Sequence, residues 1–294
     1  MAQAKLSLLL FFSLSCLSII CKSAFLPTYL YSICPKSTFT PDSKYKTNLN
    51  TLFKSLSSNV TSNPSGFHVT STANGTTDAV YGLFLCRGDQ NTTACSDCVK
   101  TATTTDLPKT YCPNSNVATI WYDECMVRYS NESLLGKMDV TPKVMLSNSE
   151  KIKGNQTRFG EIMRKTVNDM AVLTANNGSR KKFTVRTVNF TSSVTLYALE
   201  QCTPDLTANE CNRCLRVAIG QLSIMEGARI LQPSCNIRYE IYPFIMVLLI
   251  THLLISLLRK ISALTSKSVT LAKFRSKTLE LGHYQLKNCY MYVC

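Results

Sequence analysis

The sequence has 294 residues, of which 45% are hydrophobic, with only 11 Gly and 10 Pro; this composition excludes a disordered chain and allows two small domains. Residues 245–294 supply a large part of the net charge of +14. The basic residues in the rest of the chain are scattered and not clustered, which does not indicate a nucleic-acid-binding protein. The chemistry of the 14 Cys depends on whether the chain folds in an oxidising or a reducing compartment.

The first 23 residues have the layout of a secretory signal peptide. Lys5 precedes the apolar run LSLLLFFSLSCLSII, and the small residues Cys21 and Ser23 allow cleavage after Ser23. Seven N-x-[ST] glycosylation sequons follow before residue 200. They are Asn59, Asn74, Asn91, Asn131, Asn155, Asn177 and Asn189. We therefore expect a secreted glycoprotein that folds in an oxidising compartment.

Hydrophobic periodicity predicts a long helix near the start of each half of the mature chain. One apolar helical face consists of Tyr45, Leu49, Leu52, Phe53 and Leu56. The other consists of Phe159, Ile162, Met163, Met170 and Leu173. Alternation of polar and apolar residues predicts strands within 118–129 and within 183–190.

Each half also carries the same cysteine motif. The stretch YGLFLCRGDQNTTACSDC at 81–98 aligns without gaps with YALEQCTPDLTANECNRC at 197–214, and WYDECMVRYS aligns with LQPSCNIRYE further on, so the chain is a tandem duplication. A shorter helix is expected after each C-x2-C pair, most clearly from Leu215, Ala218, Ile219 and Leu222. These patterns predict an α+β fold of two tandem small domains, each with two helices packed on an antiparallel sheet.

A C-x2-C pair can be half of a zinc site, a redox dithiol or part of a disulfide framework. Zinc would need further ligands, and His68, His252 and His283 have no repeated counterpart near either motif. A thioredoxin-type dithiol has no extra cysteine shortly before its C-x2-C pair, whereas both motifs here have one, Cys86 and Cys202. Secretion favours structural disulfides, with zinc and redox chemistry as the remaining alternatives. No metal and no cofactor are expected.

These motifs resemble the ginkbilobin-like stress-antifungal domain, a plant extracellular module. The resemblance rests on C-x8-C-x2-C preceded by YGLFLC or YALEQC and followed by C-x-x-R-Y, and it covers residues 26–244. Proteins with tandem copies include cysteine-rich receptor-like kinases, cysteine-rich repeat secretory proteins and plasmodesmata-located proteins. The α+β fold that the resemblance implies agrees with the predicted elements. We place the first domain at 26–133 and the second at 138–244.

The resemblance implies that the first cysteine pairs with the fifth, the second with the third and the fourth with the sixth. The implied disulfides are Cys34–Cys112, Cys86–Cys95, Cys98–Cys125, Cys202–Cys211 and Cys214–Cys235. The second copy lacks its first and fifth cysteines, which would be partners of each other, and its interval between the fourth and sixth is six residues shorter. The second domain is therefore expected to lack one disulfide and to leave no odd thiol.

No catalytic constellation is present. The sequence has no G-x-S-x-G, H-E-x-x-H or Walker motif, and residues 245–294 contain no Gly-rich loop, H-R-D or D-F-G of a kinase. The isolated carboxylates are interpreted as surface charges. We therefore expect a non-enzymatic protein without catalytic residues.

The family includes a mannose-binding member, whose sugar site implies three positions here. They are an Asn directly after the first cysteine, an Arg six residues before the last and a Glu five residues after it. The first copy has Pro35, Thr119 and Ser130 there, whereas the second keeps Arg229 and Glu240 but lacks the first cysteine. Arg and Glu can clamp sugar hydroxyls, so these two are the candidate ligand residues, although an intramolecular ion pair beside the last strand is the favoured interpretation.

The segment IYPFIMVLLITHLLISLL, residues 241–258, precedes a basic stretch, as is typical of a membrane span with a cytoplasmic C-terminal side. Against a span stand Pro243, His252 and an apolar core shorter than the ~20 residues that a bilayer requires. Two interpretations therefore stay open. One is a transmembrane segment at 245–258 with a basic tail at 259–294, and the other is a non-native tail.

The leading hypothesis is an extracellular recognition or stress-response module of a cysteine-rich receptor-like or secretory protein that lacks the kinase domain. The alternative is a soluble antifungal lectin that binds mannose. The expected partners are a carbohydrate or another cell-surface protein, with a membrane reached through residues 241–258 if that segment spans. The expected location is outside the cell, or the plasma membrane with both repeats extracellular.

Overall fold

The computed structural model describes residues 26–178 and 181–245. The first repeat consists of one β-sheet and the helices that pack on it. Its elements are β1 (Tyr29–Ile33), α2 (Lys44–Ser58), β2 (Phe67–Thr72), β3 (Val80–Cys86), α3 (Thr92–Thr101), the π-helix η1 (Ala102–Tyr111), β4 (Ala118–Tyr122) and β5 (Cys125–Ser130). Those of the second repeat are β6 (Val144–Ser147), α4 (Gln156–Asn176), β7 (Phe183–Asn189), β8 (Thr195–Cys202), α5 (Ala208–Ile219), β9 (Gly227–Leu231) and β10 (Cys235–Glu240).

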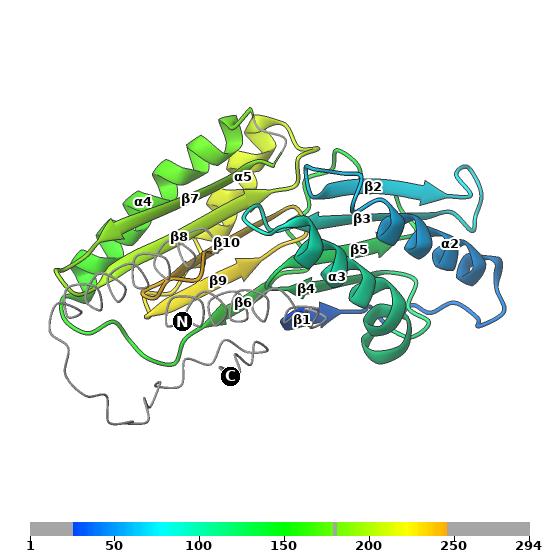
Figure 1. Ribbon diagram of the computed structural model, residues 1–294, viewed down its shortest axis with the longest axis horizontal. Helices are drawn as coiled ribbons and strands as arrows, with labels where there is room; N and C mark the ends of the chain where they lie inside the picture. Colours follow the sequence, from blue (N-terminus) through cyan, green and yellow to red (C-terminus); the bar gives the residue numbers. More distant parts are fainter. Residues whose placement is uncertain (1–25, 179–180, 246–294) are drawn as a thin grey trace, which may run out of the picture. The chain divides into compact units, whose positions relative to one another are not determined.

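The two sheets have the same topology. Each has five antiparallel strands, in the order β1-β4-β5-β3-β2 in the first repeat and β6-β9-β10-β8-β7 in the second. Within each repeat the helices pack on one face of the sheet: α2 lies against β2 and β3, and α4 lies against β7 and β8 (Figure 1). The predicted α+β fold of two antiparallel sheets, each with helices, is confirmed.

The long helices bury one face each. In α2 all five predicted positions are buried, and the helix starts at Ser43, whose hydroxyl accepts the N–H of Lys46. In α4 the prediction is wrong for Leu173, whose side chain is 49% exposed. The buried stripe of α4 runs in steps of four through Met163, Val167 and Ala171, which leaves position 173 on the solvent side.

The shorter helices begin earlier than predicted. Helices α3 and α5 contain both cysteines of the C-x2-C pair, because the caps Asn91 and Thr207 lie four residues before the first cysteine of each pair. Residues three apart share a helical face. Both cysteines of each pair therefore point toward the sheet.

The described residues contain five disulfides, Cys34–Cys112, Cys86–Cys95, Cys98–Cys125, Cys202–Cys211 and Cys214–Cys235. They are the same pairs that the family resemblance implies. Cys86 and Cys125 lie opposite each other on β3 and β5, so the two disulfides of α3 fix that helix to adjacent strands. The disulfide that the second repeat lacks would lie at the end of η1, an element with no counterpart there.

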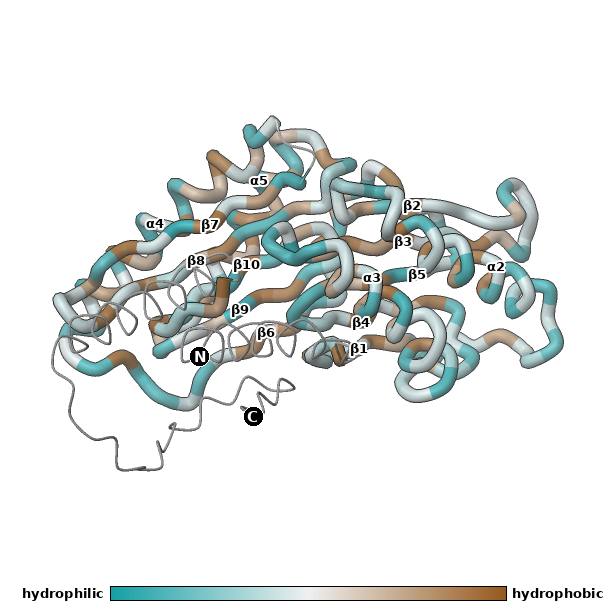
Figure 2. The backbone as a smooth tube through the Cα atoms, viewed as in Figure 1, coloured by the Kyte–Doolittle hydropathy of each residue, from teal (hydrophilic) through white to brown (hydrophobic). Residues whose placement is uncertain are grey.

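A core lies under the helices of each repeat, and a third apolar cluster contains residues of both repeats. Its buried members include Leu83, Trp121 and Met126 of the first sheet and Val144 and Leu231 of the second. Strand β3 supplies side chains both to the core under the helices of the first repeat and to the third cluster, which is why it is almost continuously apolar in sequence. Figure 2 shows this hydrophobic character along β3 and β9.

Glu200 contradicts the interpretation that the isolated carboxylates are surface charges. It occupies the position in β8 that Phe84 occupies in β3, it is fully buried, and neither carboxylate oxygen has a hydrogen-bond partner. Burial raises the pKa of Glu200 to about 9, against a smaller effect of Arg216. The carboxyl group is therefore protonated at neutral pH, which is how the core accommodates it.

Within residues 26–178 and 181–245, no helix is long and apolar enough to cross a membrane. Most of the predicted span, residues 246–258, lies outside the described residues, as do the predicted signal peptide and the basic tail.

Candidate functional site

The two candidate ligand residues of the second repeat lie on adjacent strands. Strands β9 and β10 pair antiparallel, with Arg238 opposite Arg229. Successive side chains of a strand point to opposite faces, and the neighbours Ile230 and Tyr239 are buried in the core under α4 and α5. Arg229, Arg238 and Glu240 therefore share the other face of the sheet.

This face receives Asp123, from the turn between β4 and β5 of the first repeat. Its Oδ1 accepts a hydrogen bond from Nη1 of Arg229 at 2.9 Å and one from Nη1 of Arg238 at 3.0 Å. Its Oδ2 accepts from Nη1 of Arg87 at 2.9 Å. One carboxylate thus binds three guanidinium groups, two of them from the other repeat. We call Arg87, Asp89, Asp123, Arg229, Arg238 and Glu240 the junction cluster.

The remaining carboxylates of the junction cluster balance its charge. Arg87 donates through Nε to Asp89 Oδ1 at 2.7 Å, and Arg238 donates through Nε to Glu240 Oε1 at 2.9 Å. The guanidinium of Arg238 also lies 3.9 Å from the ring centre of Phe244, which is favourable for a cation over an aromatic face. Three cations and three carboxylates therefore form a neutral, mostly buried group between the repeats.

The charges in the cluster fix the protonation of its central acid. Burial opposes ionisation of Asp123, but the positive charges of Arg87, Arg238 and Arg229 outweigh burial and lower its pKa to about 2. For Arg229, burial and the like charge of Arg238 lower the pKa. Asp123 is therefore ionised at neutral pH and compensates for crowding among the arginines.

Arg229 and Glu240 are both engaged in ion pairs, with partners other than each other. The side chain of Arg229 is 13% exposed and binds Asp123, and that of Glu240 is 5% exposed and binds Arg238. Gly227 lies opposite Glu240, and a Cβ atom at 227 would collide with Oε2 of Glu240. The structure brings the two predicted residues to one place, but it surrounds them with protein.

The space beside the junction cluster is small. A cavity of about 40 Å³ is lined by residues of both repeats, among them Trp121, Asp123, Gln201 and Arg238. Such a volume holds a few water molecules, and the indole N–H of Trp121 has no protein acceptor there. Ligand pockets are typically several times larger. Within the described residues, no group of three or more His, Cys, Asp or Glu could hold a metal ion.

Sequence reasoning missed Asp123 and Arg87, which give the cluster its shape. Arg238 stands in the C-x-x-R-Y motif, which marks it, but its partner Asp123 lies 115 positions earlier in the chain. The first copy has Arg128 at the equivalent place, and this side chain binds Asp139 in the connection between the repeats. The repeat alignment shows which residues correspond, but not that one copy contacts the other.

The seven sequon asparagines fall into two groups. The amide Nδ2 of Asn59 donates to the carbonyl of Ser55, and that of Asn177 donates to the carbonyl of Phe183, both at 2.9 Å. These two residues are half-buried. The exposed sequon residues are Asn74, Asn91, Asn131, Asn155 and Asn189.

Two comparisons by sequence find similar proteins. The chain matches the family model described as salt stress response/antifungal twice, over residues 33–132 and 146–242. It is 45% identical over 225 residues to the cysteine-rich receptor-like protein kinase 25 of Arabidopsis thaliana and 41% identical over 223 residues to the putative cysteine-rich receptor-like protein kinase 9 of the same plant. Each match covers 74% of this chain. The chain spans 33% of the length of the first relative and 83% of the second.

Two solved structures are similar in fold. They are the tandem DUF26 ectodomains of the Arabidopsis thaliana cysteine-rich receptor-like proteins PDLP8 and PDLP5. The TM-scores are 0.64 and 0.58, and the sequence identities are 22% and 26%. Each comparison covers 74% of this chain and 100% of the solved chain. The match therefore extends over both domains of each solved ectodomain.

Proposed function

The chain belongs to the salt stress response/antifungal family, and on this premise we propose that its two repeats form a non-enzymatic extracellular recognition module of a receptor-like or secretory protein. The observation that carries the proposal is the likeness of both repeats together to the ectodomains of cysteine-rich receptor-like proteins. Five disulfides in about 220 residues are typical of proteins that meet an oxidising environment.

The chemistry of the junction cluster favours recognition over catalysis. A catalytic acid or base needs access to substrate and a pKa near the working pH. Asp123 is ionised and held by three arginines, and Glu240 is 5% exposed. The cluster instead joins two domains, which suits a protein whose task is to present a fixed surface.

The alternative of a mannose-binding lectin has less support. The second repeat keeps two of the three family positions, but Arg229 and Glu240 are hydrogen-bonded within the protein. The equivalent residues of the first repeat, Thr119 and Ser130, are buried. A sugar would have to displace existing ion pairs, so we assign no mannose site.

The extracellular part of the proposal can be tested on the full chain, expressed with its own N-terminus in plant cells. Labelling of intact cells with a membrane-impermeant amine reagent should modify the chain, and glycosidase treatment should lower its mass. The matched control is the same chain without residues 1–23, which should stay inside the cell and remain unglycosylated. A full chain that is unlabelled, unglycosylated and rich in free thiols would refute the extracellular assignment.

The recognition part needs a binding measurement. The secreted full chain, fused to a reporter enzyme, should bind plant or fungal cell-wall preparations saturably, with competition by unlabelled chain. The control is the same fusion after reduction and alkylation, which removes the disulfide framework. Binding that is equal for the native and the reduced fusion, or absent from all surfaces, would contradict a recognition role.

A further inference from the structure

A second pocket lies in the first repeat, beside the Cys86–Cys95 disulfide. Its volume is about 170 Å³, and the residues that line it come from the loop after α2, from residues 86–95 and from Lys181 of the second repeat. An apolar cavity of ~150 Å³ is known to hold a six-membered ring. The pocket is thus large enough for one ring-sized molecule.

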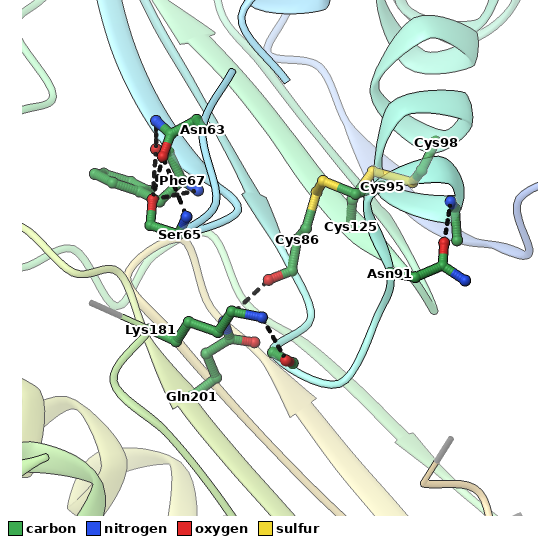
Figure 3. Close-up of a disulfide and its surroundings, with 12 residues drawn as sticks. Asn63, Ser65, Phe67, Cys86, Asn91, Cys95, Cys98, Cys125, Lys181 and Gln201 are labelled. Atoms are coloured by element: carbon green, nitrogen blue, oxygen red, sulfur yellow. Dashed lines mark hydrogen bonds between the residues drawn. A yellow bond between two sulfur atoms is a disulfide. The ribbon is translucent and has the colours of Figure 1, made fainter. Parts of the chain in front are cut away.

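The wall of the pocket is held by its own hydrogen bonds. Asn63 donates through Nδ2 to the carbonyl of Phe67, and its Oδ1 accepts from the Ser65 hydroxyl at 2.6 Å (Figure 3). Gly66 has a φ of +67°, and a Cβ there would lie 3.3 Å from Cβ of Cys86. Glycine therefore allows the loop to lie directly against the disulfide. The pocket has preformed walls.

A buried amide in the pocket has no partner for its oxygen. Gln90 is 9% exposed, lines the pocket, and its Oε1 accepts no hydrogen bond. An unpaired buried acceptor is costly, and a ligand hydroxyl would satisfy it. The second repeat has Leu206 at the same position, fully buried in its core. The fold therefore does not require a polar residue at position 90.

The pocket also has a positive side. The ammonium of Lys181 reaches across to the carbonyl of Gly88 at 2.9 Å (Figure 3) and retains two further N–H groups. Within the described residues Lys181 forms no ion pair, and no Asp or Glu lines the pocket. Asn91 and Thr92 at its edge form the start of α3, whose first-turn N–H groups have no acceptor within the helix. These features favour an anion.

We propose that this pocket binds a sugar acid, a ring-sized molecule with one carboxylate and several hydroxyls. The carboxylate lies between Lys181 and the start of α3, and a ring hydroxyl donates to Oε1 of Gln90. The chemistry is that of a hexuronate, whether as the free acid or as the end of a polymer. Arg87 lines this pocket and also belongs to the junction cluster, whereas Gln90, Asn91 and Lys181 line this pocket and lie outside the cluster. The proposal goes beyond the recognition function by naming a ligand class.

The sequon residue Asn91 lines this pocket. Its Oδ1 caps α3 by accepting the N–H of Ala94 at 2.8 Å, and its Nδ2 is the atom that would carry a glycan. A glycan on Asn91 would lie beside the pocket. Thr93→Ala removes this sequon and keeps both the cap and the pocket residues, so occupied and unoccupied forms can be compared.

The test is calorimetric titration of the secreted full chain, carrying Thr93→Ala, with galacturonate, trigalacturonate, galactose and inorganic phosphate. We expect galacturonate to bind at least tenfold more tightly than galactose, the size of one lost charged hydrogen bond. Lys181→Gln should weaken galacturonate binding about tenfold or more, whereas Lys100→Gln, an exposed site on α3 that does not line the pocket, should leave it unchanged. Gln90→Leu, which copies the second repeat, should weaken galacturonate but not phosphate.

Tighter binding of trigalacturonate identifies a polymer end as the source, equal binding identifies the free acid, and both support the proposal. Four results would overturn it. The first two are no galacturonate binding at millimolar concentration and equal binding of galactose and galacturonate. The others are an unchanged galacturonate affinity in Lys181→Gln, and phosphate binding as tight as galacturonate binding together with an unchanged galacturonate affinity in Gln90→Leu. Melting temperatures verify that each variant is folded. Because cell-wall binding of the fusion protein is measured separately, failure here leaves the recognition proposal standing.

Discussion

Replacing Asp123 with Asn should destabilise the protein through the junction cluster. Asn has nearly the shape of the protonated carboxyl, so the free energy lost approximates that of protonating Asp123 in the folded protein. The pKa falls from 3.8 to about 2 on folding, and each unit corresponds to ~1.4 kcal/mol. Asp123→Asn should therefore lower the free energy of unfolding by roughly 2 to 3 kcal/mol, which is about 4 to 12 °C in melting temperature for a domain pair of this size.

The assay is thermal and urea unfolding of the full chain between pH 7 and pH 2. Because the pKa of Asp123 is lowered in the folded state, its contribution is complete above about pH 4 and is lost as the pH falls toward 2. The difference between wild type and Asp123→Asn should shrink over the same range. The matched control is Asp169→Asn, which removes an equal charge from an exposed pair with Lys165 and should change little.

Two results would refute this reasoning. One is an unchanged melting temperature for Asp123→Asn at pH 7, and the other is a difference from wild type that persists at pH 2. A double-mutant cycle with Arg229→Gln adds an independent criterion, since two residues 2.9 Å apart should show non-additive losses. Additive losses would mean that the ion pair contributes nothing.

Three further predictions concern single sites. Mass spectrometry of glycopeptides should find Asn59 and Asn177 largely unoccupied, because a glycan on Nδ2 would break their bonds to backbone carbonyls, while the five exposed sequons are occupied. The protein should lose stability as the pH rises from about 4.5 to about 9, because Glu200 is protonated when folded and ionised when unfolded; Glu200→Gln should flatten this dependence in urea titrations. Calorimetry should detect mannose binding no tighter than millimolar, and Arg229→Ala should lower the melting temperature.

Each of these has a clear contrary result. Full glycan occupancy at Asn59 or Asn177 would show that these amides are free when the glycan is added. An unchanged pH dependence in Glu200→Gln would place the titrating group elsewhere. Micromolar mannose binding, lost in Arg229→Ala protein that remains folded, would restore the lectin interpretation.

The parts of the fold that follow from local patterns could be predicted from the sequence. The apolar face of α2 follows from helical periodicity, and all five of its predicted residues are buried. The apolar residues of α5 do not mark where the helix starts, because its start is set by Thr207 and Glu210, which form a capping box before the cysteines. Helix bounds can therefore be predicted from local sequence when the capping residues are considered together with the apolar periodicity.

The junction cluster could not be predicted, because the contacts of Asp123 with Arg229 and Arg238 join residues 106 and 115 positions apart. Arg229 and Glu240 were identified from the family motif, but their partners depend on which face of one sheet meets the other repeat. Glu200 was missed for a similar reason, since alternation along β8 places it inward while its charge suggests the surface. Burial of a carboxyl in a core follows only from the packed structure.

The contact through Asp123 is asymmetric, because the first repeat supplies the carboxylate and the second repeat supplies Arg229 and Arg238. Contacts that join one copy head-to-tail to the next can continue indefinitely and build filaments. Here the turn that carries Asp123 has Pro233 as its equivalent in the second repeat, and the strand position of Arg229 is Thr119 in the first. At these positions the second repeat has no carboxylate and the first has no arginine. The second repeat therefore cannot make the same contact with a further copy, and exchanging the order of the two repeats would remove the pair of Asp123 and Arg229.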